Sequence, residues 1–508
     1  MNVNLKVIVF LLSIAAIGFA VILGVSVGSG EYLLPSLAMA GFAALLLISH
    51  PQLAAAGAVA TFFSGITIPG LPGQMRLFDA LAAALIGIFI LQATFRKASY
   101  KQIPFSRLEW LVLAFCAWIF FIGFVRGFGF LAFGEDKIGG FNYIRLLLTA
   151  SLVITLPRIG IHADSWRTCM LIAGILAPAS LIADLLVMRG WSFGAARLFI
   201  QSGQSENALE DAADADPSGL TRLFSAGAAA NGMLIALLCL VPMRKFFRMT
   251  GIFWLVLFAG IFTLSLLSGF RLMTVSLVTV AGLALFFQKG FTAPRMVVLF
   301  VAGCVSLLFV YIFVGYFPNS MQRALSWLPG IQVSNVALAD ATQTIDWRLE
   351  VWREAMRYLP DYWLIGKGFS YDKMAYIDAM QSIDTTQWAI VTSSYHNSWL
   401  SMLLCTGVIG TILCLFLLIG PLLRHWKRQR ASWNNPLFQR IHGVLLAGLT
   451  TTVAAYFVIY GEVHTSFPVI FFYWAIMETL SLSDAKEEAA ISAEQESSQR
   501  FESIYQEV

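Results

Sequence analysis

Apolar runs of about twenty residues follow one another along most of this chain, and they constrain its fold more than any other feature. A helix of that length crosses the roughly 30 Å of hydrocarbon in a bilayer, where helices and closed barrels satisfy their own backbone groups. The sequence therefore predicts an all-α, polytopic transmembrane helix bundle of about 12 to 14 spans. The expected spans are residues 5–27, 31–49, 52–68, 76–95, 108–127, 141–157, 167–188, 222–242, 248–266, 270–288, 295–316, 396–420, 439–459 and 463–482.

Composition excludes a water-soluble fold. Hydrophobic residues make up 58% of the 508 and charged residues only 12%, far from the balance of a soluble domain. The net charge of +4 comes from bases in short loops rather than from a basic stripe, so no nucleic-acid partner is expected. The six cysteines fall inside apolar runs, which favours packing roles over a disulfide framework or a metal site.

Lysines and arginines gather in the short loops on one side of the predicted bundle, and such loops face the cytoplasm. Both termini are therefore expected in the cytoplasm, and two long polar segments on the outer, periplasmic side. The expected division is N-terminal spans (1–189), a periplasmic loop (190–221), central spans (222–316), a large helical periplasmic loop (317–394), C-terminal spans (395–483) and a disordered cytoplasmic tail (484–508).

Ionisable residues inside apolar runs mark functional positions, because a charge in hydrocarbon is costly unless it is paired or hydrated. With the orientation above, each lies at the outer end of its predicted span, which indicates one outward-facing polar cavity. These residues are Arg76, Asp79, Arg145, Asp184, Arg222 and Arg271.

The large loop contains a predicted amphipathic helix over residues 342–359, lying along the membrane or capping the bundle. Its apolar positions at helical spacing are Ile345, Leu349, Trp352, Met356 and Leu359. Arg348 falls at the edge of this stripe, so it is the loop arginine expected to point inward.

Arginine indicates phosphate chemistry, since a guanidinium group binds phosphate in bidentate fashion and keeps its charge in a partly dry site. Several arginines near a membrane surface suggest a lipid phosphate or pyrophosphate. His396 lies where the large loop meets the next span, and from there it could deprotonate or orient an acceptor hydroxyl, or donate to a phosphate oxygen.

Structural roles remain open for several of these residues. Arg76 and Arg145 can each be interfacial anchors, and His396 can be a packing or capping residue. His464 beside Glu462 is interpreted as a structural pair. The Asp214-Ala-Asp216 sequence resembles a metal-binding motif, but its acidic, small-residue surroundings favour a solvated linker.

Four segments together resemble the bacterial O-antigen ligase and O-antigen polymerase superfamily. They follow one another in the family's order on one predicted membrane face, over roughly residues 220–420. The segments are Arg222-Leu223-Phe224-Ser225 with Ala230-Asn231, then Ser268-Gly269-Phe270-Arg271, then Arg348 to Trp352 with Gly366-Lys367-Gly368, and last Tyr395-His396-Asn397-Ser398-Trp399-Leu400 with Cys405-Thr406-Gly407-Val408-Ile409-Gly410.

The resemblance implies a metal-independent, GT-C-like inverting glycosyltransferase without a cofactor, in the bacterial inner membrane. Its donor would be an oligosaccharide on undecaprenyl pyrophosphate, and its acceptor a glycan or glycolipid. Arg222, Arg271 and Arg348 would bind the pyrophosphate, and His396 would serve the acceptor or the leaving group. The expected supporting residues are Asn397, Tyr395, Asn231, Asp79 and Arg145. Cys405 and Phe270 depart from the family pattern.

Three functions stay open at this point. A polymerase of O-antigen or exopolysaccharide repeat units is preferred to a ligase that transfers glycan to lipid A-core. A ligase would need a basic surface for its phosphate-rich acceptor, whereas both outer loops carry more acids than bases. A non-enzymatic exporter of lipid or glycan is the third alternative.

Overall fold

The computed structural model describes residues 49–66, 75–95, 104–130, 135–188, 223–248, 251–382, 385–458 and 460–506. The predicted spans 5–27 and 31–48, the loop 190–221 and Arg222 lie outside these ranges. Within them the chain is almost entirely helical, and the one sheet is a two-stranded antiparallel pair of β1 (Lys137–Ile138) and β2 (Tyr371–Asp372). The predicted all-α, polytopic class is confirmed.

Eight helices of the described chain are long and apolar enough to cross a membrane, and shorter apolar helices accompany them. The membrane-length helices are α4 (Leu77–Phe95), α5 (Arg107–Arg126), α6 (Gly140–Ile159), the consecutive α7 (Ser165–Leu176) and α8 (Ala179–Met188), α13 (Ala293–Phe313), α19 (Ser398–Arg430), α20 (Pro436–Val458) and α21 (Val463–Gln506). The shorter ones are α10 (Phe224–Leu240), α11 (Ile252–Leu267) and α12 (Arg271–Phe287). The predicted span over 52–68 contains α3 (Pro51–Thr61), whose 11 residues are too short to cross a bilayer.

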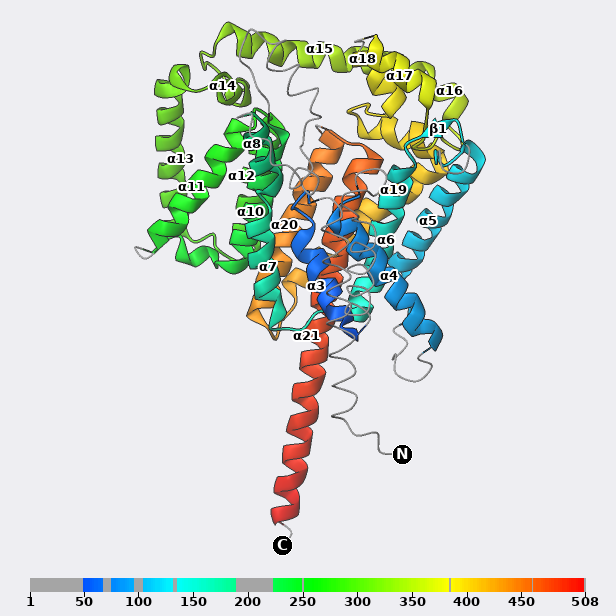
Figure 1. Cartoon of the computed structure of the whole chain (residues 1–508). Coiled ribbons are helices and arrows are strands. Elements are labelled where there is room, and N and C mark those ends of the chain that lie inside the picture. Colours follow the sequence, from blue (N-terminus) through cyan, green and yellow to red (C-terminus); the bar gives the residue numbers. More distant parts are fainter. Residues whose placement is uncertain are drawn as a thin grey trace, which may run out of the picture.

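The first half of α21 is the central helix of the bundle. It packs against α6, α19 and α20, and α20 in turn packs against α10 and α12 (Figure 1). Aromatic rings also join α21 to the end of α3 and to α5: Phe472 stacks on Phe62 at 3.6 Å between ring centroids, and Phe467 stacks on Phe115 at 5.7 Å. Since lipid removes the hydrophobic drive between helices, such close packing holds them together. At the periphery, α13 has no buried residue.

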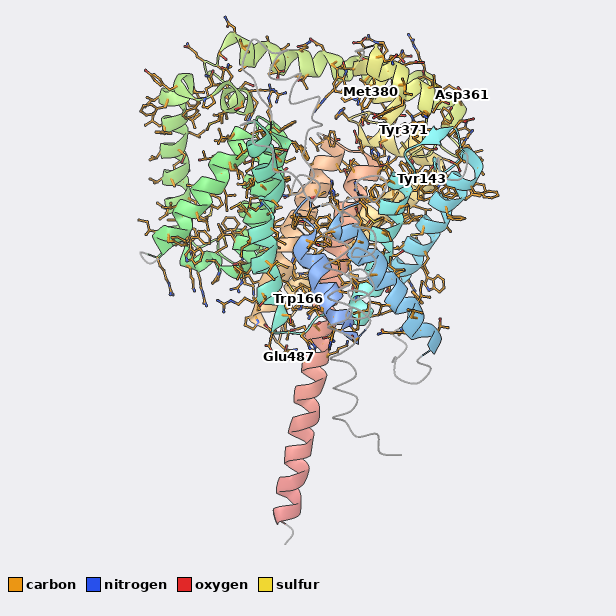
Figure 2. All side chains as sticks on the ribbon, viewed as in Figure 1. Tyr143, Trp166, Asp361, Tyr371, Met380 and Glu487 are labelled. Atoms are coloured by element: carbon orange, nitrogen blue, oxygen red, sulfur yellow. The ribbon has the colours of Figure 1, made fainter. Side chains whose placement is uncertain are left out.

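The large loop forms a helical layer over one end of the bundle, opposite the end from which the C-terminus leaves (Figure 1). The layer contains α14 (Asn319–Leu325), α15 (Asn335–Arg357), α16 (Leu359–Tyr362), α17 (Lys373–Gln381) and α18 (Thr385–Thr392). Figure 2 shows Tyr371 and Met380 in this layer and Glu487 at the other end of the bundle. The loop is thus the roof of the bundle, and α15 crosses it from α14 to α18.

Two details of this part differ from expectation. The apolar stripe predicted over residues 342–359 packs only in part: Trp352 and Leu359 lie against the core, whereas Ile345, Leu349 and Met356 are about half exposed. Val351 and Ala355, outside the predicted stripe, are buried as well. The tail expected to be disordered instead continues α21 as helix to Gln506.

Candidate functional site

His396 lies in the turn between α18 and α19, directly beneath α15. Its backbone has φ +52°, a left-handed conformation that costs a non-glycine residue on the order of 1 kcal/mol and that collects at functional sites. The imidazole lies 5.0 Å from the ring of Trp347 and 4.7 Å from the ring of Tyr460, measured between centroids. Its Nδ1 is buried and has no hydrogen-bond partner in the described part of the chain. The ring is therefore held by packing, with a polar atom left for a ligand.

The residues on either side of His396 fix its position. Asn397 caps α19, since its side-chain oxygen accepts a hydrogen bond from the backbone N–H of Leu400 at 3.2 Å. Tyr395 is buried, and its carbonyl accepts the indole N–H of Trp352 at 2.8 Å. The supporting residues Tyr395 and Asn397 thus hold the turn on which the imidazole sits.

Arg348 lies one helical turn before Trp352, on the same side of α15. While Trp352 anchors the helix to the His396 turn, Arg348 lies within electrostatic range of both His396 and Tyr460. Burial, together with the positive charge of Arg348, lowers the pKa of His396 to about 4. The imidazole is therefore neutral at neutral pH.

Glu462 completes a polar cluster around His396. Its carboxylate interacts with the Tyr460 hydroxyl and the His396 backbone N–H, and its Oε2 lies 3.7 Å from His464 Nε2. Oε1 is buried without a hydrogen-bond partner among the described residues. Burial raises the pKa of Glu462 to about 7, which is where a general acid or base is effective. The pair expected to be purely structural thus lies against the predicted catalytic histidine.

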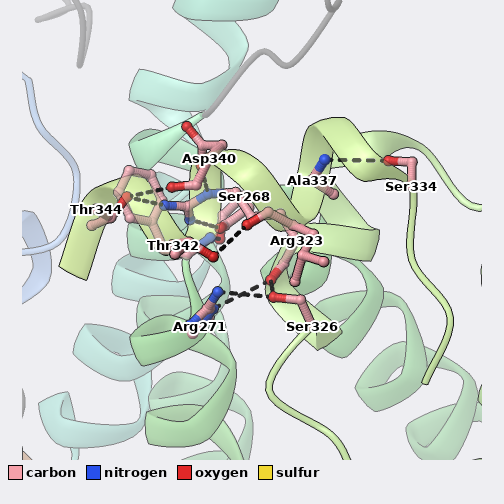
Figure 3. A network of polar contacts seen from close by, with 12 residues as sticks. Ser268, Arg271, Arg323, Ser326, Ser334, Ala337, Asp340, Thr342 and Thr344 are labelled. Carbon is pink, nitrogen blue, oxygen red and sulfur yellow. Dashed lines mark hydrogen bonds and ion pairs between the residues drawn. The ribbon is translucent and has the colours of Figure 1, made fainter. Parts of the chain in front are cut away.

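Arg271 is the first residue of α12, and its guanidinium group points to α14 (Figure 3). It donates to Ser326 Oγ at 2.9 Å and to the Arg323 carbonyl at 3.4 Å. Arg348 and Arg323 both lie within electrostatic range of it. The fold therefore brings Arg271 and Arg348 into one electropositive region, although one is on a bundle helix and the other on the roof.

The Gly366-Lys367-Gly368 segment anchors the roof to a break in α19. That break falls at Gly407, with φ 68° and ψ −177°, and it leaves helix carbonyls without their usual partners. The carbonyl of Leu404 accepts the Lys367 N–H at 2.7 Å, and that of Cys405 accepts the Gly368 N–H at 3.1 Å. A Cβ at Gly366 would lie 2.5 Å from the Cys405 oxygen, and both loop glycines have positive φ. Only glycine fits such a close approach of two backbones.

Lys367 is a partly buried cation to which the sequence analysis gave no role beyond its place in the Gly366-Lys367-Gly368 segment. Its ammonium group donates to the Ile390 carbonyl at 2.8 Å and lies 5.3 Å from the centroid of the Tyr395 ring. Burial lowers the pKa of Lys367 to about 8. Its contacts tie α18 to the turn that carries His396.

The other predicted supporting residues, Asp79, Arg145 and Asn231, lie between helices of the bundle. Arg145 pairs with the buried Asp79 at 3.3 Å, joining α6 to α4, and it lies within electrostatic range of His464. Asn231 interacts with the Tyr473 hydroxyl between α10 and α21, inside the bundle. Arg348 therefore lies within electrostatic range of both Arg271 and His396, and Arg145 lies within such range of His464.

Sequence analysis missed Arg323, Tyr460 and Glu462 as parts of this region. Tyr460 and Glu462 lie in the short turn between the last two predicted spans. An acidic residue so close to two spans could have marked this turn as part of the site. Arg323 gave no signal, because it lies in a polar loop whose fold could not be inferred. No group of three metal-ligating side chains occurs in the described ranges, and Asp214 and Asp216 lie outside them.

The fold and site together define a polytopic, all-α membrane protein with an arginine-rich polar site between its bundle and a helical roof. Residues 251–415 match the family model described as O-Antigen ligase. The predicted relationship to the O-antigen ligase and polymerase superfamily is confirmed on this segment, which contains Arg271, Arg323, Arg348 and His396. It supports a membrane function like that of these proteins. A search of curated proteins gave no match.

Proposed function

We propose that this protein is an inner-membrane glycosyltransferase that moves a glycan from undecaprenyl pyrophosphate to a hydroxyl of an acceptor glycan at the periplasmic face. The observation that carries the proposal is the convergence of Arg348, His396, Tyr460 and Glu462, with Arg271 in the same electropositive region. These residues come from the roof, the start of α19, the α20–α21 turn and α12.

Arg271 and Arg348 have the charge and geometry to bind a diphosphate leaving group. When the bond between the sugar and the pyrophosphate breaks, negative charge grows on the departing oxygen, and fixed positive groups lower that barrier. Arg271 and Arg348 supply such charge without a metal ion, and guanidinium forks match phosphate oxygens. Arg222 is proposed as a third contact by the family resemblance.

Glu462 and His396 have the properties needed to activate and orient the acceptor hydroxyl. A carboxylate whose pKa is about 7 can take the proton of the attacking hydroxyl at neutral pH, whereas the neutral His396 can orient that hydroxyl by a hydrogen bond. In the proposed reaction the acceptor oxygen forms the new glycosidic bond, the old bond to the pyrophosphate breaks, and Glu462 receives the proton. One displacement from the face opposite the leaving group inverts the anomeric carbon.

Polymerization of repeat units is the preferred form of this reaction. The sequence of the large loop, residues 317–394, contains fewer bases than acids. The bases are Arg323, Arg348, Arg353, Arg357, Lys367 and Lys373, and the acids are Asp340, Asp346, Glu350, Glu354, Asp361, Asp372, Asp378 and Asp384. Such a surface offers little to a phosphate-rich lipid A-core. Ligation of the glycan to lipid A-core remains the second candidate, because the matching family model is described as O-Antigen ligase and the superfamily contains both kinds of enzyme.

Deleting the protein in its native cell and examining the surface glycan tests the proposal. Lipopolysaccharide with a single repeat unit indicates a polymerase, whereas long chains retained on the lipid carrier indicate a ligase. Loss of a separate capsule indicates exopolysaccharide synthesis. Unchanged surface glycan would contradict the proposal. Complementation with His396→Ala then separates catalysis from export, because an exporter has no need of the imidazole.

A further inference from the structure

Arg323 of α14 uses all three nitrogens of its guanidinium group in contacts with other residues. It is only 5% exposed, although it carries a full positive charge. Its Nε pairs with Asp340, one amino group donates to the Gly269 carbonyl at 2.6 Å, and the other donates to Thr344 Oγ1 at 3.2 Å (Figure 3). A buried guanidinium group with all three nitrogens bonded is fixed in one geometry.

These contacts join three separate elements. Gly269 belongs to the turn before α12, two residues from Arg271, while Thr344 lies one helical turn before Arg348 on α15. Arg323 itself is on α14, and its carbonyl and the Ser326 hydroxyl accept the hydrogen bonds of Arg271. Arg323 therefore sets the position of Arg271 through its main chain and of the α15 segment before Arg348 through its side chain.

The charges around Arg323 indicate why such a connection is needed. Arg271, Arg323 and Arg348 lie within electrostatic range of one another, and like charges repel. Asp340 pairs with Arg323. A ligand with two negative phosphates would reduce the repulsion between Arg271 and Arg348, and it would bind best if the two guanidinium groups were already held near each other.

We propose that Arg323 is a positioning residue that preorganises Arg271 and Arg348 as one diphosphate-binding pair, without contacting the diphosphate itself. This inference rests on the proposed function and adds the residue that assembles its anion site. Preorganised groups lose less entropy on binding and stabilise developing charge without rearranging. The roof helix and the bundle then act as one site because Arg323 joins them.

The inhibition of glycan transfer by inorganic pyrophosphate reports how tightly Arg271 and Arg348 together bind a diphosphate. Arg323→Lys keeps the charge but cannot make the three-way contact, so we expect the inhibition constant of pyrophosphate and the donor KM each to rise about ten-fold. In an Arg271→Ala background, the same substitution should raise the inhibition constant only about three-fold, since the effect through Arg271 is already removed and only the effect through Arg348 remains. Arg357→Lys, at an exposed ion pair of α15, is the control and should change neither.

Thr344→Val is a milder variant that keeps the shape of the side chain and removes one contact to Arg323. Thr342→Val is its match, because the Thr342 hydroxyl bonds only its own helix, to the Leu338 carbonyl at 3.0 Å. We expect Thr344→Val to weaken pyrophosphate inhibition about three-fold and Thr342→Val to leave it unchanged.

Unchanged pyrophosphate inhibition in a folded Arg323→Lys protein would overturn the inference. If that variant does not insert, equal behaviour of the two threonine variants overturns it instead. If Arg323 only stabilises the fold, Arg323→Lys should lower the melting temperature without changing the inhibition constant of pyrophosphate. Absence of glycan transfer by the wild-type protein would contradict the proposed function, whereas an active wild type with an equally inhibited Arg323→Lys contradicts only the role of Arg323.

Discussion

The imidazole of His396 packs against the phenol ring of Tyr460, with 4.7 Å between the ring centroids. His396 precedes α19 and Tyr460 lies in the turn between α20 and α21, so the contact joins the C-terminal helices at the end that the roof covers. Two residues beyond Tyr460, Glu462 lies against the backbone of His396. The contact thus places a neutral base, a hydroxyl and a carboxyl group in one cluster beneath Arg348.

Replacing His396 by Ala should reduce glycan transfer by at least about 100-fold, because the acceptor hydroxyl loses the group that orients it. Transfer is measured with purified protein and a lipid-linked donor. His162→Ala, at an exposed turn before α7, is the control and should retain full activity. Full transfer by a folded His396→Ala protein would remove the catalytic assignment.

The pH dependence of transfer should follow Glu462. Its pKa of about 7 predicts that kcat/KM rises as pH increases through 7, since only the ionised carboxylate accepts a proton. Glu462→Gln should lower the rate about 100-fold or more and remove this rise. A wild-type profile that is flat between pH 6 and pH 8 would contradict the role of Glu462 as base.

The stability of Glu462→Gln provides the control for that variant. In the folded protein the pKa of Glu462 is about 7 instead of 4.5, so folding favours its protonated form. The ionised carboxylate therefore destabilises the fold above pH 7, and this penalty disappears as pH falls below 4.5. Glu462→Gln should raise the melting temperature at pH 8 but not at pH 4, which shows that lost activity is not lost folding.

Arg348→Lys should lower kcat/KM for the lipid-linked donor about 10- to 100-fold. Lysine keeps the positive charge but cannot bind two phosphate oxygens with a planar fork. Arg353→Lys, on the exposed face of the same helix, is the matched control. Equal kinetics for the two variants would argue against a diphosphate contact at Arg348.

Gly366→Ala should destabilise the protein by on the order of 3 kcal/mol, because a Cβ there meets the Cys405 carbonyl oxygen at 2.5 Å. Gly330→Ala is the matched control: that glycine has φ +76°, close to the +88° of Gly366, but open space around its Cβ. Its cost should be only about 1 kcal/mol, from backbone strain. Thermal unfolding of the two variants separates steric conflict from strain.

The orientation of the bundle predicts opposite accessibility for its two ends. A cysteine at the exposed Met380 in the roof should react with a membrane-impermeant maleimide in cells with a permeabilised outer membrane. A cysteine at Arg430, at the end of α19, should react only after the inner membrane is opened. Cys304→Ser removes the exposed native thiol from the background. Labelling of both positions from the periplasm would overturn the orientation.

The sequence alone determined the class of this protein and much of its site. Apolar runs near bilayer thickness leave a helix bundle as the structure that satisfies the backbone in lipid, and most predicted spans coincide with helices of the described chain. Charged residues in such runs are costly, so the position of Arg271 within an apolar run was enough to make it a candidate for the site. The order of the motifs added Arg348 and His396.

Only the tertiary structure decided how those residues meet. Helical spacing predicted one apolar stripe on α15, of which Trp352 packs against the core while Ile345 and Met356 are about half exposed, because burial depends on the neighbouring helix as well as on hydrophobicity. Glu462 contacts the backbone of His396, and Arg323 links the turn before α12 to α15. Both contacts join segments that are distant in sequence. The periodicity of a sequence predicts the face of a helix on which a side chain lies. The residue that this side chain contacts depends on how the helices pack.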